Sequence, residues 1–283
     1  MSGAAVRRGG LLPTAALLAG AVYCLLPVLW VLLAATKTRA ELFSTFTYAP
    51  SFHGGLVSNV RDLFAYGDGR FALWARNSLL YAGAGAALST VVSAAAGYAL
   101  AKYRFRGRTV IFNILLAGVL LPQITLAVPQ YLLLAKLHLA GTYWSVLLPT
   151  VIYPYGIYLC RIYAAAAVPD EMLDAGRVDG AGEGRIFAAL AIPTMLPGLI
   201  TVFLLQFVAI WNNFLLPFIM LSDEDRYPLT LGLFTMLDQG VSQQALYSLV
   251  ITGALLSIAP LVALFLFLQR YWRIDLLSGA VKR

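Results

Sequence analysis

The chain has 283 residues, of which 60% are hydrophobic and only 12% are charged, and its mean hydropathy is +0.80. A soluble domain carries roughly 25% charged residues, so this composition excludes a water-soluble domain and predicts an integral membrane protein. A net charge of +7 can indicate binding to nucleic acid, but in a membrane protein the excess Lys and Arg residues usually lie in cytoplasmic loops and set the orientation. We therefore expect membrane lipid, and no nucleic acid, as a partner.

Six apolar runs predict helices that span a bilayer, for which about 20 residues are needed. They cover residues 11–35, 79–100, 110–135, 143–162, 199–221 and 246–268. The first run exceeds the core of about 7 to 15 residues of a secretory signal, which favours a helix that is retained. We therefore predict an all-α integral membrane protein with six transmembrane helices and with both termini on one side.

The basic residues indicate which side is cytoplasmic. Four of them lie at 102–108, between the second and third spans, and four more at 270–283, whereas Lys136 is the only Lys or Arg between spans three and four. The loop at 222–245 holds four acids and a single arginine. Because short cytoplasmic loops are rich in Lys and Arg, we expect both termini, the 102–108 loop and the polar stretch at 168–197 to be cytoplasmic.

The second span carries a small residue at every fourth position, namely Gly85, Ser89, Ser93 and Gly97. Small side chains at this spacing let another helix approach closely, so we predict a packing face. Prolines lie within or at the ends of most spans, and each can kink its helix where neighbouring helices or water satisfy the freed carbonyls. This pattern favours a transporter over an inert anchor.

No sequence feature predicts a catalytic site, a metal site or a cofactor. His53 and His138 have no second ligand at metal spacing, and the chain has no Gly-x-x-x-x-Gly-Lys-Ser/Thr phosphate loop. The span interiors hold no ionisable residue, because Arg76 and Arg161 lie at span edges. Since ion-coupled pumps normally need such residues, we expect a passive pore or a transporter driven by another subunit, and no enzyme activity.

Residues 168–197 form a long polar insert with five acids and two arginines, too charged to cross a bilayer. Pro169 suits a helix start, so we predict a first helix at 169–178. The turn residues at 179–182 end it, and a second helix at 183–191 leads to stops at Pro193 and Pro197. The insert is thus predicted to be a helix-turn-helix on the cytoplasmic surface, between the fourth and fifth spans.

On the first of these helices, Met172, Ala175, Gly176 and Asp179 fall on one face by their i, i+3, i+4 spacing. The small residues of this face predict that it seats closely in a groove. One alternative is an amphipathic helix that rests on lipid headgroups. Because the helix is net acidic and anionic lipid would repel it, we favour a protein partner.

Several short motifs recur together in a known family. In the polar insert they are Asp174-Ala175-Gly176, Asp179-Gly180-Ala181, Phe187, and Ile192-Pro193 with Pro197. Elsewhere they are Asn77-Ser78-Leu79, Tyr98-Ala99-Leu100-Ala101, Thr142-Tyr143-Trp144 and Trp211-Asn212-Asn213-Phe214. With these motifs the chain resembles binding-protein-dependent ATP-binding cassette importer permeases, in particular the carbohydrate-uptake branch with the maltose-type inner-membrane permease, and the insert resembles their EAA loop.

The resemblance implies that the insert is a coupling helix, which in this family enters a cleft of the ATPase subunit. The implied coupling residues are Met172, Asp174, Ala175, Gly176, Asp179, Gly180, Ala181 and Pro193. The family's Glu-Ala-Ala reads Asp174-Ala175-Gly176 here. Aspartate keeps the charge with a shorter reach, and glycine costs about 1 kcal/mol of helix stability relative to alanine.

The resemblance also implies partners and a location. The partners are a second permease subunit, two ATP-binding cassette ATPase subunits and an extracytoplasmic substrate-binding protein that touches the loop at 222–245. The location is the bacterial inner membrane. We divide the chain into an N-terminal span with its external loop at 1–71, an ABC permease core at 72–270 and a cytoplasmic tail at 271–283.

A polar and aromatic group in the fifth span is a candidate substrate path. It comprises Trp211, Asn212, Asn213 and Phe214, with Gln123 of the third span as a weaker candidate. Amides pair with sugar hydroxyls while aromatic ring faces cover the apolar side of a sugar. The alternative is an interhelical hydrogen bond, because an amide in hydrocarbon needs a partner, and the sequence leaves both interpretations open.

We therefore predict the transmembrane permease subunit of an ATP-driven, binding-protein-dependent importer for a sugar or oligosaccharide. A stand-alone channel or facilitator is one alternative, because it needs no partner. A second alternative is an importer of the same class for peptides, polyamines or phosphate esters.

Overall fold

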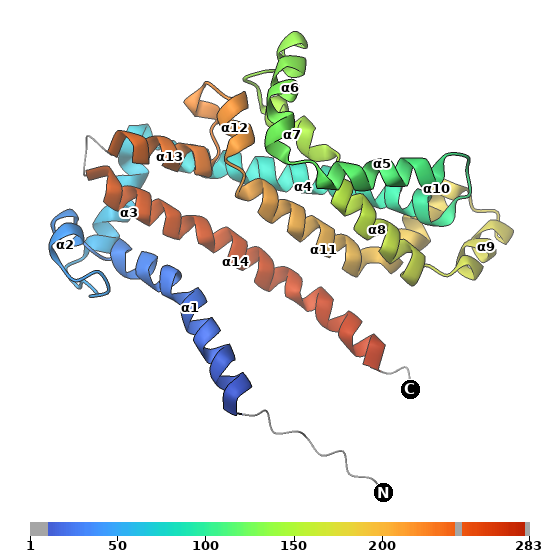
Figure 1. Ribbon diagram of the computed structural model, residues 1–283, viewed down its shortest axis with the longest axis horizontal. Coiled ribbons are helices and arrows are strands. Elements are labelled where there is room, and N and C mark those ends of the chain that lie inside the picture. Colours follow the sequence, from blue (N-terminus) through green and yellow to red (C-terminus); the bar gives the residue numbers. More distant parts are fainter. Residues whose placement is uncertain (1–10, 241–244, 281–283) are drawn as a thin grey trace, which may run out of the picture. The chain divides into compact units, whose positions relative to one another are not determined.

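The computed structural model describes residues 11–240 and 245–280, and within these ranges all regular structure is helical (Figure 1). The described residues form two compact units: one contains 11–69, 235–240 and 245–257, and the other contains 70–234 and 258–280. The predicted domain boundaries after residues 71 and 270 stay a prediction. Residues 281–283 of the predicted tail lie outside the described residues.

Five helical segments of the described chain are long and apolar enough to cross a bilayer. They are Leu12–Ala35, Arg70–Lys102, Tyr143–Ala167, Glu183–Trp211 and Leu246–Tyr271. A sixth candidate is the pair Arg108–Leu120 and Ile124–Lys136, which is bent by 108°. The prediction of an all-α, multi-pass membrane protein is confirmed, and the third predicted span is broken into two helices.

The bend in the third span lies between α5 (Arg108–Leu120) and α6 (Gln123–Lys136). A residue that precedes proline is pushed out of the α region, and Leu121 is accordingly extended, with φ −74° and ψ 125°. Pro122 is extended as well, with φ −61° and ψ 127°. Two extended residues in succession redirect the chain, so the span predicted at 110–135 is not a straight helix.

In the unit that contains the N-terminal helix α1 (Leu11–Ala35), side-chain hydrogen bonds to main-chain carbonyls hold the loop after α1 in place. Asn59 of α3 (Gly55–Ala65) is buried and donates to the carbonyl oxygens of Ala35 and Lys37 at 3.1 and 2.9 Å. Lys37 is 1% exposed, and its Nζ donates to two main-chain carbonyls at 2.7 and 3.2 Å. A buried ammonium group needs such acceptors, so the loop after α1 folds back on the end of the helix.

This loop contains the short helix α2 (Arg39–Ser44), which starts with a capping box between Thr38 and Glu41. The Glu41 carboxylate also accepts from Ser51 Oγ at 2.8 Å and lies 2.6 Å from His53 Nδ1. Hydrogen bonds from the Thr38 main chain and from the Ser51 and Thr38 hydroxyls lower the pKa of Glu41 to about 2. The loop after the first span is therefore an ordered element.

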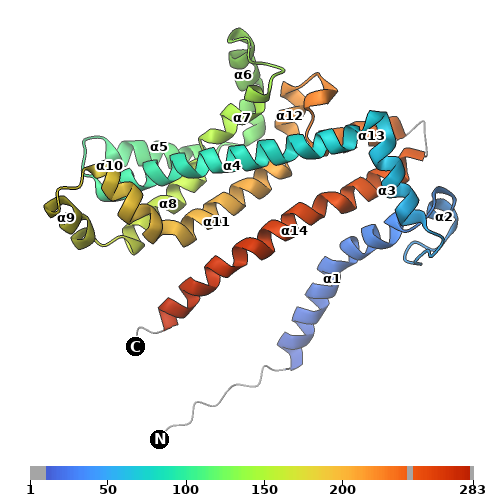
Figure 2. The same cartoon turned by 180° about the vertical axis from the view of Figure 1, so that it is seen from behind.

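The other unit is built around the 33-residue helix α4 (Arg70–Lys102). The elements that follow α5 and α6 are α7 (Tyr143–Val151), α8 (Pro154–Ala167), α9 (Asp170–Val178), α10 (Glu183–Ile186), η2 (Phe187–Ala191), α11 (Ile192–Trp211), α12 (Leu215–Met220) and η3 (Glu224–Arg226). Helices α7, α8 and α11 pack against α4 (Figure 2). α13 (Leu229–Gly240) and α14 (Ala245–Ala280) contribute to both units.

The small-residue stripe of α4 is buried at all four positions. A Cβ atom added at Gly97 would lie 2.5 Å from Cys160 Cβ and 2.7 Å from the main-chain nitrogen of Arg161. One added at Gly85 would lie 2.8 Å from Ile210 Cδ1. These separations are shorter than van der Waals contact, so α8 and α11 approach α4 this closely only because glycine stands there. The predicted packing face is confirmed.

The fourth span is interrupted between α7 and α8, where Pro154 starts the second helix. Proline has no N–H, so the carbonyl oxygen of Thr150, four residues earlier, has no helical partner. Gln206 of α11 is buried, and its Nε2 donates to this oxygen at 3.0 Å. A neighbouring helix thus satisfies the carbonyl that the proline frees.

The fifth span differs from its prediction at both ends. It was expected at 199–221, after stops at Pro193 and Pro197, whereas the helical path runs over Glu183–Trp211 and through both prolines. The segment η2 is a π-helix, and the N–H of Ile192 reaches back five residues. Pro193 thereby falls in the first turn of α11, where a proline is tolerated because that N–H is not needed. The predicted proline stops are wrong.

Candidate functional site

The candidate site is α9, the helix predicted at 169–178, which spans Asp170–Val178. Pro169 precedes it in an extended conformation, with φ −67° and ψ 142°. Asp170 and Glu171 lie in its first turn, where negative charge interacts favourably with the positive end of the helix dipole. Local sequence therefore accounts for where this helix starts.

The end of α9 is a Schellman motif. The N–H of Gly180 donates to the carbonyl of Arg177 at 3.0 Å, and the N–H of Ala181 donates to the carbonyl of Gly176 at 3.0 Å. Gly180 has φ +77°, a conformation that strains any residue with a side chain. The predicted turn residues Gly180 and Ala181 thus lie where the chain leaves α9 for α10.

One face of α9 packs into the protein. Leu173 is 2% exposed, Gly176 is buried, and Met172 is half-buried at the edge of the same core. A Cβ atom added at Gly176 would lie 3.1 Å from Leu190 Cδ1 and 3.2 Å from Ile186 Cγ1. Gly176, which was predicted to lie on the groove-binding face, thus packs against its own chain, and its role in coupling stays a prediction.

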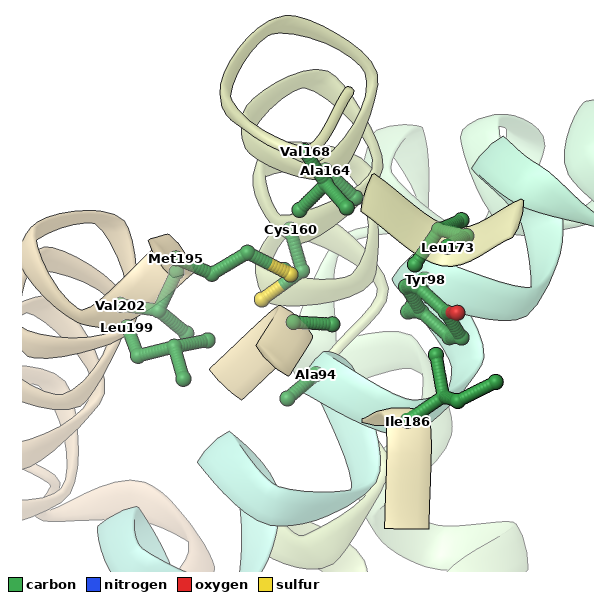
Figure 3. Packing of buried hydrophobic residues seen from close by; sticks show 11 residues of the cluster. Ala94, Tyr98, Cys160, Ala164, Val168, Leu173, Ile186, Met195, Leu199 and Val202 are labelled. Atoms are coloured by element: carbon green, nitrogen blue, oxygen red, sulfur yellow. The ribbon is translucent and has the colours of Figure 1, made fainter. Parts of the chain in front are cut away.

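The inward face of α9 joins a core shared with the spanning helices (Figure 3). Its buried members are Ala94, Tyr98, Cys160, Ala164, Val168, Leu173, Ile186, Ala191, Met195, Leu199 and Val202. In Figure 3, Leu173, Tyr98 and Ile186 lie next to one another, although they come from α9, α4 and α10. Burying a leucine side chain contributes about 1.5–3 kcal/mol, so Leu173 is a strong anchor of α9 on the core.

The first residue of α9 is held by the last residue of α4. Lys102 Nζ donates to Asp170 Oδ1 at 2.7 Å, and the Lys102 side chain is only 9% exposed. This hydrogen bond and the charge of the lysine hold the pKa of Asp170 below its usual value. A carboxyl group with a lowered pKa keeps its ion pair at neutral pH and loses it as the pH falls through that lowered pKa.

The last turn of α9 is held by a second network. The Arg177 guanidinium donates to Asp174 Oδ1 at 2.8 Å and to Glu183 Oε1 at 2.8 Å. Tyr103, the first residue beyond α4, donates its hydroxyl to Glu183 Oε2 at 2.7 Å. Hydrogen bonds to the two carboxylates raise the pKa of Arg177, so this group stays charged. Tyr103 and Glu183 were not among the site residues predicted from the sequence.

The opposite face of α9 is exposed and carries one large apolar side chain. Val178 is 87% exposed, and its neighbours on the helix, Asp174, Ala175 and Asp179, are exposed as well. Val178 was not among the residues predicted from the sequence, although a residue four positions after Asp174 lies on the same helix face. Pro193, which was also assigned to coupling, is exposed in the first turn of α11.

The asparagines of the predicted substrate path lie at the end of α11 and not inside the span. Asn212 is exposed, and its Nδ2 donates to the Val208 carbonyl of its own helix at 2.9 Å. Asn213 Oδ1 accepts the N–H of Leu216 at 3.2 Å, at the start of α12. Among the described residues, neither side chain bonds to another transmembrane helix. Gln123 begins α6, and its side chain lies outside the described residues.

The two aromatic residues of the same group have different surroundings. Trp211 is buried and stacks on Phe207, with ring centroids 5.8 Å apart. Phe214 packs against Phe218 and Phe234, at centroid distances of 5.2 and 4.7 Å, and both of these rings are exposed. Trp211 is thus a packing residue, whereas Phe214 belongs to a partly exposed aromatic group. A contact of either with substrate stays a prediction.

The end of α4 far from α9 holds a turn at residues 223–227. Trp74, Asn77 and Tyr81 donate to four main-chain carbonyl oxygens of this turn, at 2.8–3.1 Å. Asn77 is fully buried, and its Oδ1 accepts the hydroxyl of Tyr143 at 3.1 Å. The turn lies in the loop that was predicted to contact an external binding protein, and that contact stays a prediction.

Comparisons of the sequence with known proteins agree with this architecture. A family model described as "Binding-protein-dependent transport system inner membrane component" matches residues 89–273. The arabinooligosaccharides transport system permease protein AraQ of Halalkalibacterium halodurans is 34% identical over 262 residues, which are 90% of each chain. The lactose transport system permease protein LacG of Rhizobium radiobacter is 29% identical over 256 residues, again 90% of each chain.

A solved structure shares the fold. It is the crystal structure of a bacterial ABC transporter involved in the import of the acidic polysaccharide alginate. One of its chains matches with a TM-score of 0.81 and 20% sequence identity, over 96% of this chain and 99% of that chain. This likeness confirms the helical transmembrane fold.

Proposed function

The chain belongs to the family of binding-protein-dependent transport system inner membrane components, and on this basis we propose that α9 is the helix through which a separate ATPase subunit drives transport. The chain is a multi-pass permease subunit and not an enzyme. The observation that carries the proposal is the outward face of α9, where Val178 is 87% exposed beside Asp174 and Asp179.

The chemistry of this face favours a protein cleft over a lipid surface. One exposed valine offers too little apolar area to hold a helix on a membrane, and anionic lipid repels the acids around it. A cleft with an apolar pocket and a basic rim suits both features. The opposite face of α9 is buried in the core of the spanning helices, so a partner that moves α9 also moves that core.

We place this subunit in a bacterial inner membrane, with both termini and α9 on the cytoplasmic side. The end of α4 that holds α9 is followed by the basic loop at 102–108, and its other end holds the acidic turn at 223–227. This charge asymmetry supports the orientation. The proposed complex contains a second permease subunit, two ATPase subunits and an extracytoplasmic binding protein.

A sugar or oligosaccharide is the proposed cargo. The names of the relatives support it, since AraQ is named for arabinooligosaccharides and LacG for lactose. The exposed amide of Asn212 and the partly exposed ring of Phe214 suit a sugar that passes the end of α11. Ligand profiling of the cognate binding protein tests the cargo. We expect saccharide ligands, and ligands that are only peptides, polyamines or phosphate esters would contradict the assignment.

Val178→Asp tests the docking role of α9. A charge at the centre of the contact must be desolvated against an apolar pocket, so we expect the amount of ATPase subunit that copurifies to fall by roughly ten-fold, about 1.4 kcal/mol. The matched control is Val57→Asp, which changes a valine that is 75% exposed on α3, outside the candidate spans. We expect this control to copurify the ATPase at the wild-type level.

Two outcomes would contradict the proposal. If Val178→Asp retained both the ATPase and substrate-stimulated hydrolysis, α9 would not be the docking helix. If the purified chain alone gave solute flux in liposomes without ATP, the chain would be a stand-alone channel or facilitator. We expect no flux from the chain alone, because an importer subunit needs its partners to cycle.

A further inference from the structure

The end of α4 is connected to both ends of α9. Lys102, the last residue of α4, binds Asp170 at the start of α9 at 2.7 Å. Tyr103, the next residue, binds Glu183 at 2.7 Å, and Glu183 binds Arg177 in the last turn of α9 at 2.8 Å. Two successive residues beside one helix end thus reach both ends of the candidate coupling helix.

Apart from its main-chain hydrogen bonds and the apolar packing of α9, the turn between α9 and α10 has few contacts that fix its geometry. Gly180, Gly182 and Gly184 lie in or beside it, and a Cβ atom added at any of them would meet no atom within 4 Å. Glycine leaves the backbone conformationally free, so this turn can bend when α9 is pushed. Apart from apolar packing and the main-chain turn, the link between Arg177 and Glu183 is the contact that joins α9 to α10 within the described residues.

Glu183 is a branch point in this network. One carboxylate oxygen accepts from Arg177 Nε and the other accepts from the Tyr103 hydroxyl, and hydrogen bonds to a charged acceptor are the strong kind. The Tyr103 ring packs edge-on against Tyr98 at 5.6 Å, and Tyr98 packs on Phe187 at 5.0 Å. The network therefore runs from an exposed carboxylate on α10 to a buried ring of α4.

We propose that Tyr103 and Glu183 are positioning residues that fix the angle of α9 against α4, so that a displacement of α9 is delivered to α4 instead of being absorbed in the turn at Gly180. This inference rests on the proposed function, in which an ATPase subunit moves α9. Tyr103 and Glu183 act through Arg177, which they hold in place, and through the ring of Tyr98.

The test uses the complete transporter in liposomes, with both permease subunits, the ATPase and the binding protein. Tyr103→Phe removes one hydroxyl and keeps the ring that packs on Tyr98. We expect the ATPase to copurify at the wild-type level while the ratio of solute imported to ATP hydrolysed falls roughly three-fold or more, within the range by which single residues change coupling. The matched control is Tyr155→Phe, because the hydroxyl of Tyr155 forms no hydrogen bond among the described residues, and we expect its ratio to be unchanged.

A double-mutant cycle distinguishes a positioning role of the Tyr103–Glu183 hydrogen bond from a general loss of stability. If Tyr103 acts through Glu183, the variant that combines Tyr103→Phe with Glu183→Ala loses no more coupling than Glu183→Ala alone, because both changes break the same hydrogen bond. The thermal unfolding midpoint of the permease subunit should stay at the wild-type value in all three variants. Additive losses of coupling, or a lower midpoint that accounts for them, would overturn the inference.

The two proposals fail in different ways. If wild-type protein and Val178→Asp bound the ATPase equally, the docking role of α9 would be wrong, and with it the basis of this inference. If Val178→Asp lost the ATPase but Tyr103→Phe kept the wild-type ratio of import to hydrolysis, the docking role would stand. In that case the positioning role of Tyr103 and Glu183 would be wrong.

Discussion

The two ends of α4 hold their neighbours by different chemistry. At its start, Trp74, Asn77 and Tyr81 bind main-chain carbonyls of the turn at 223–227, and all three side chains are buried. At its other end, Lys102 and the adjacent residue bind carboxylates of surface residues on α9 and α10. Between these ends lie 33 residues of helix, a distance of about 50 Å at 1.5 Å per residue.

This difference separates a fixed end from an adjustable end. Buried neutral hydrogen bonds to main-chain groups allow one geometry, and breaking one leaves a polar group without a partner. Exposed ion pairs contribute little to stability, are screened by salt, and can exchange partners at little cost. An element that is displaced in each ATPase cycle needs the second kind of contact, which holds its angle in each arrangement and can form again after the displacement, whereas a preformed turn needs the first kind.

The largest effect on stability is expected for Asn77→Ala, at the fixed end of α4. This change removes the donor to the Asp225 and Tyr227 carbonyls and the acceptor of Tyr143, so we expect a loss of about 1–3 kcal/mol of unfolding free energy. The measurement is thermal unfolding of the purified subunit in detergent. Asn212→Ala is the control, since Asn212 is exposed and, among the described residues, its side chain bonds only within its own helix. Equal midpoints for the two variants would remove the distinction between the two ends.

At the adjustable end, Asp170→Asn is expected to change the salt dependence of coupling and not the stability of the subunit. The pair with Lys102 is exposed on the aspartate side, so we expect no measurable change in the unfolding midpoint at neutral pH. We expect instead that the import-to-hydrolysis ratio of the wild type falls as NaCl rises from about 0.05 M to about 1 M, while that of the variant changes less. The same salt response in both proteins would show that this ion pair does not set the position of α9.

The pH dependence of the import-to-hydrolysis ratio provides a second test with the same variant. Because the pKa of Asp170 is lowered by Lys102, the pair is intact above the usual aspartate range and is lost as the pH falls through the lowered value. The import-to-hydrolysis ratios of wild type and Asp170→Asn should therefore differ at neutral pH and converge in acid, where Asp170 is protonated and neutral like asparagine. A difference that grew as the pH fell would have the wrong sign for this assignment.

Local pattern located the six apolar segments and α9, although it gave neither the break in the third span nor the bounds of the fifth. Hydropathy located the apolar runs because a bilayer demands about 20 apolar residues in succession. Pro169, the first-turn acids and Gly180 each have a local conformational preference, and together they fixed the bounds of a nine-residue helix almost to the residue. The packing stripe of α4 was predictable because a repeat of four keeps small residues on one helix face.

The rest depends on contacts that no local pattern contains. Leu173 and Val178 both belong to an acidic helix, and only the core beneath α9 decides that Leu173 is buried and Val178 exposed. From the sequence alone, Pro193 predicts the end of a helix, and only the π-helical segment before it explains why the helix continues. Asn77 binds a turn about 150 residues away, and its role follows from the packing of the bundle and not from its neighbours in the sequence.

The smallest effect is expected for Tyr98→Phe, which is best compared with Tyr81→Phe on the same helix. Both tyrosines are 2% exposed. The Tyr81 hydroxyl donates to the Arg226 carbonyl at 3.0 Å, whereas the Tyr98 hydroxyl is buried beside the Tyr103 hydroxyl and forms no well-aligned hydrogen bond within the described residues. We expect Tyr81→Phe to cost about 1 kcal/mol of unfolding free energy and Tyr98→Phe to be neutral or slightly stabilising, because it removes an unsatisfied group.

The same variant also tests whether the Tyr98 hydroxyl matters for coupling. Tyr98→Phe keeps the ring that packs against Tyr103 and Phe187, so we expect it to leave the import-to-hydrolysis ratio unchanged. If it instead destabilised the subunit as much as Tyr81→Phe does, the hydroxyl would already be satisfied in the folded state. The contrast between the two ends of α4 would then rest on Lys102 and Tyr103 alone.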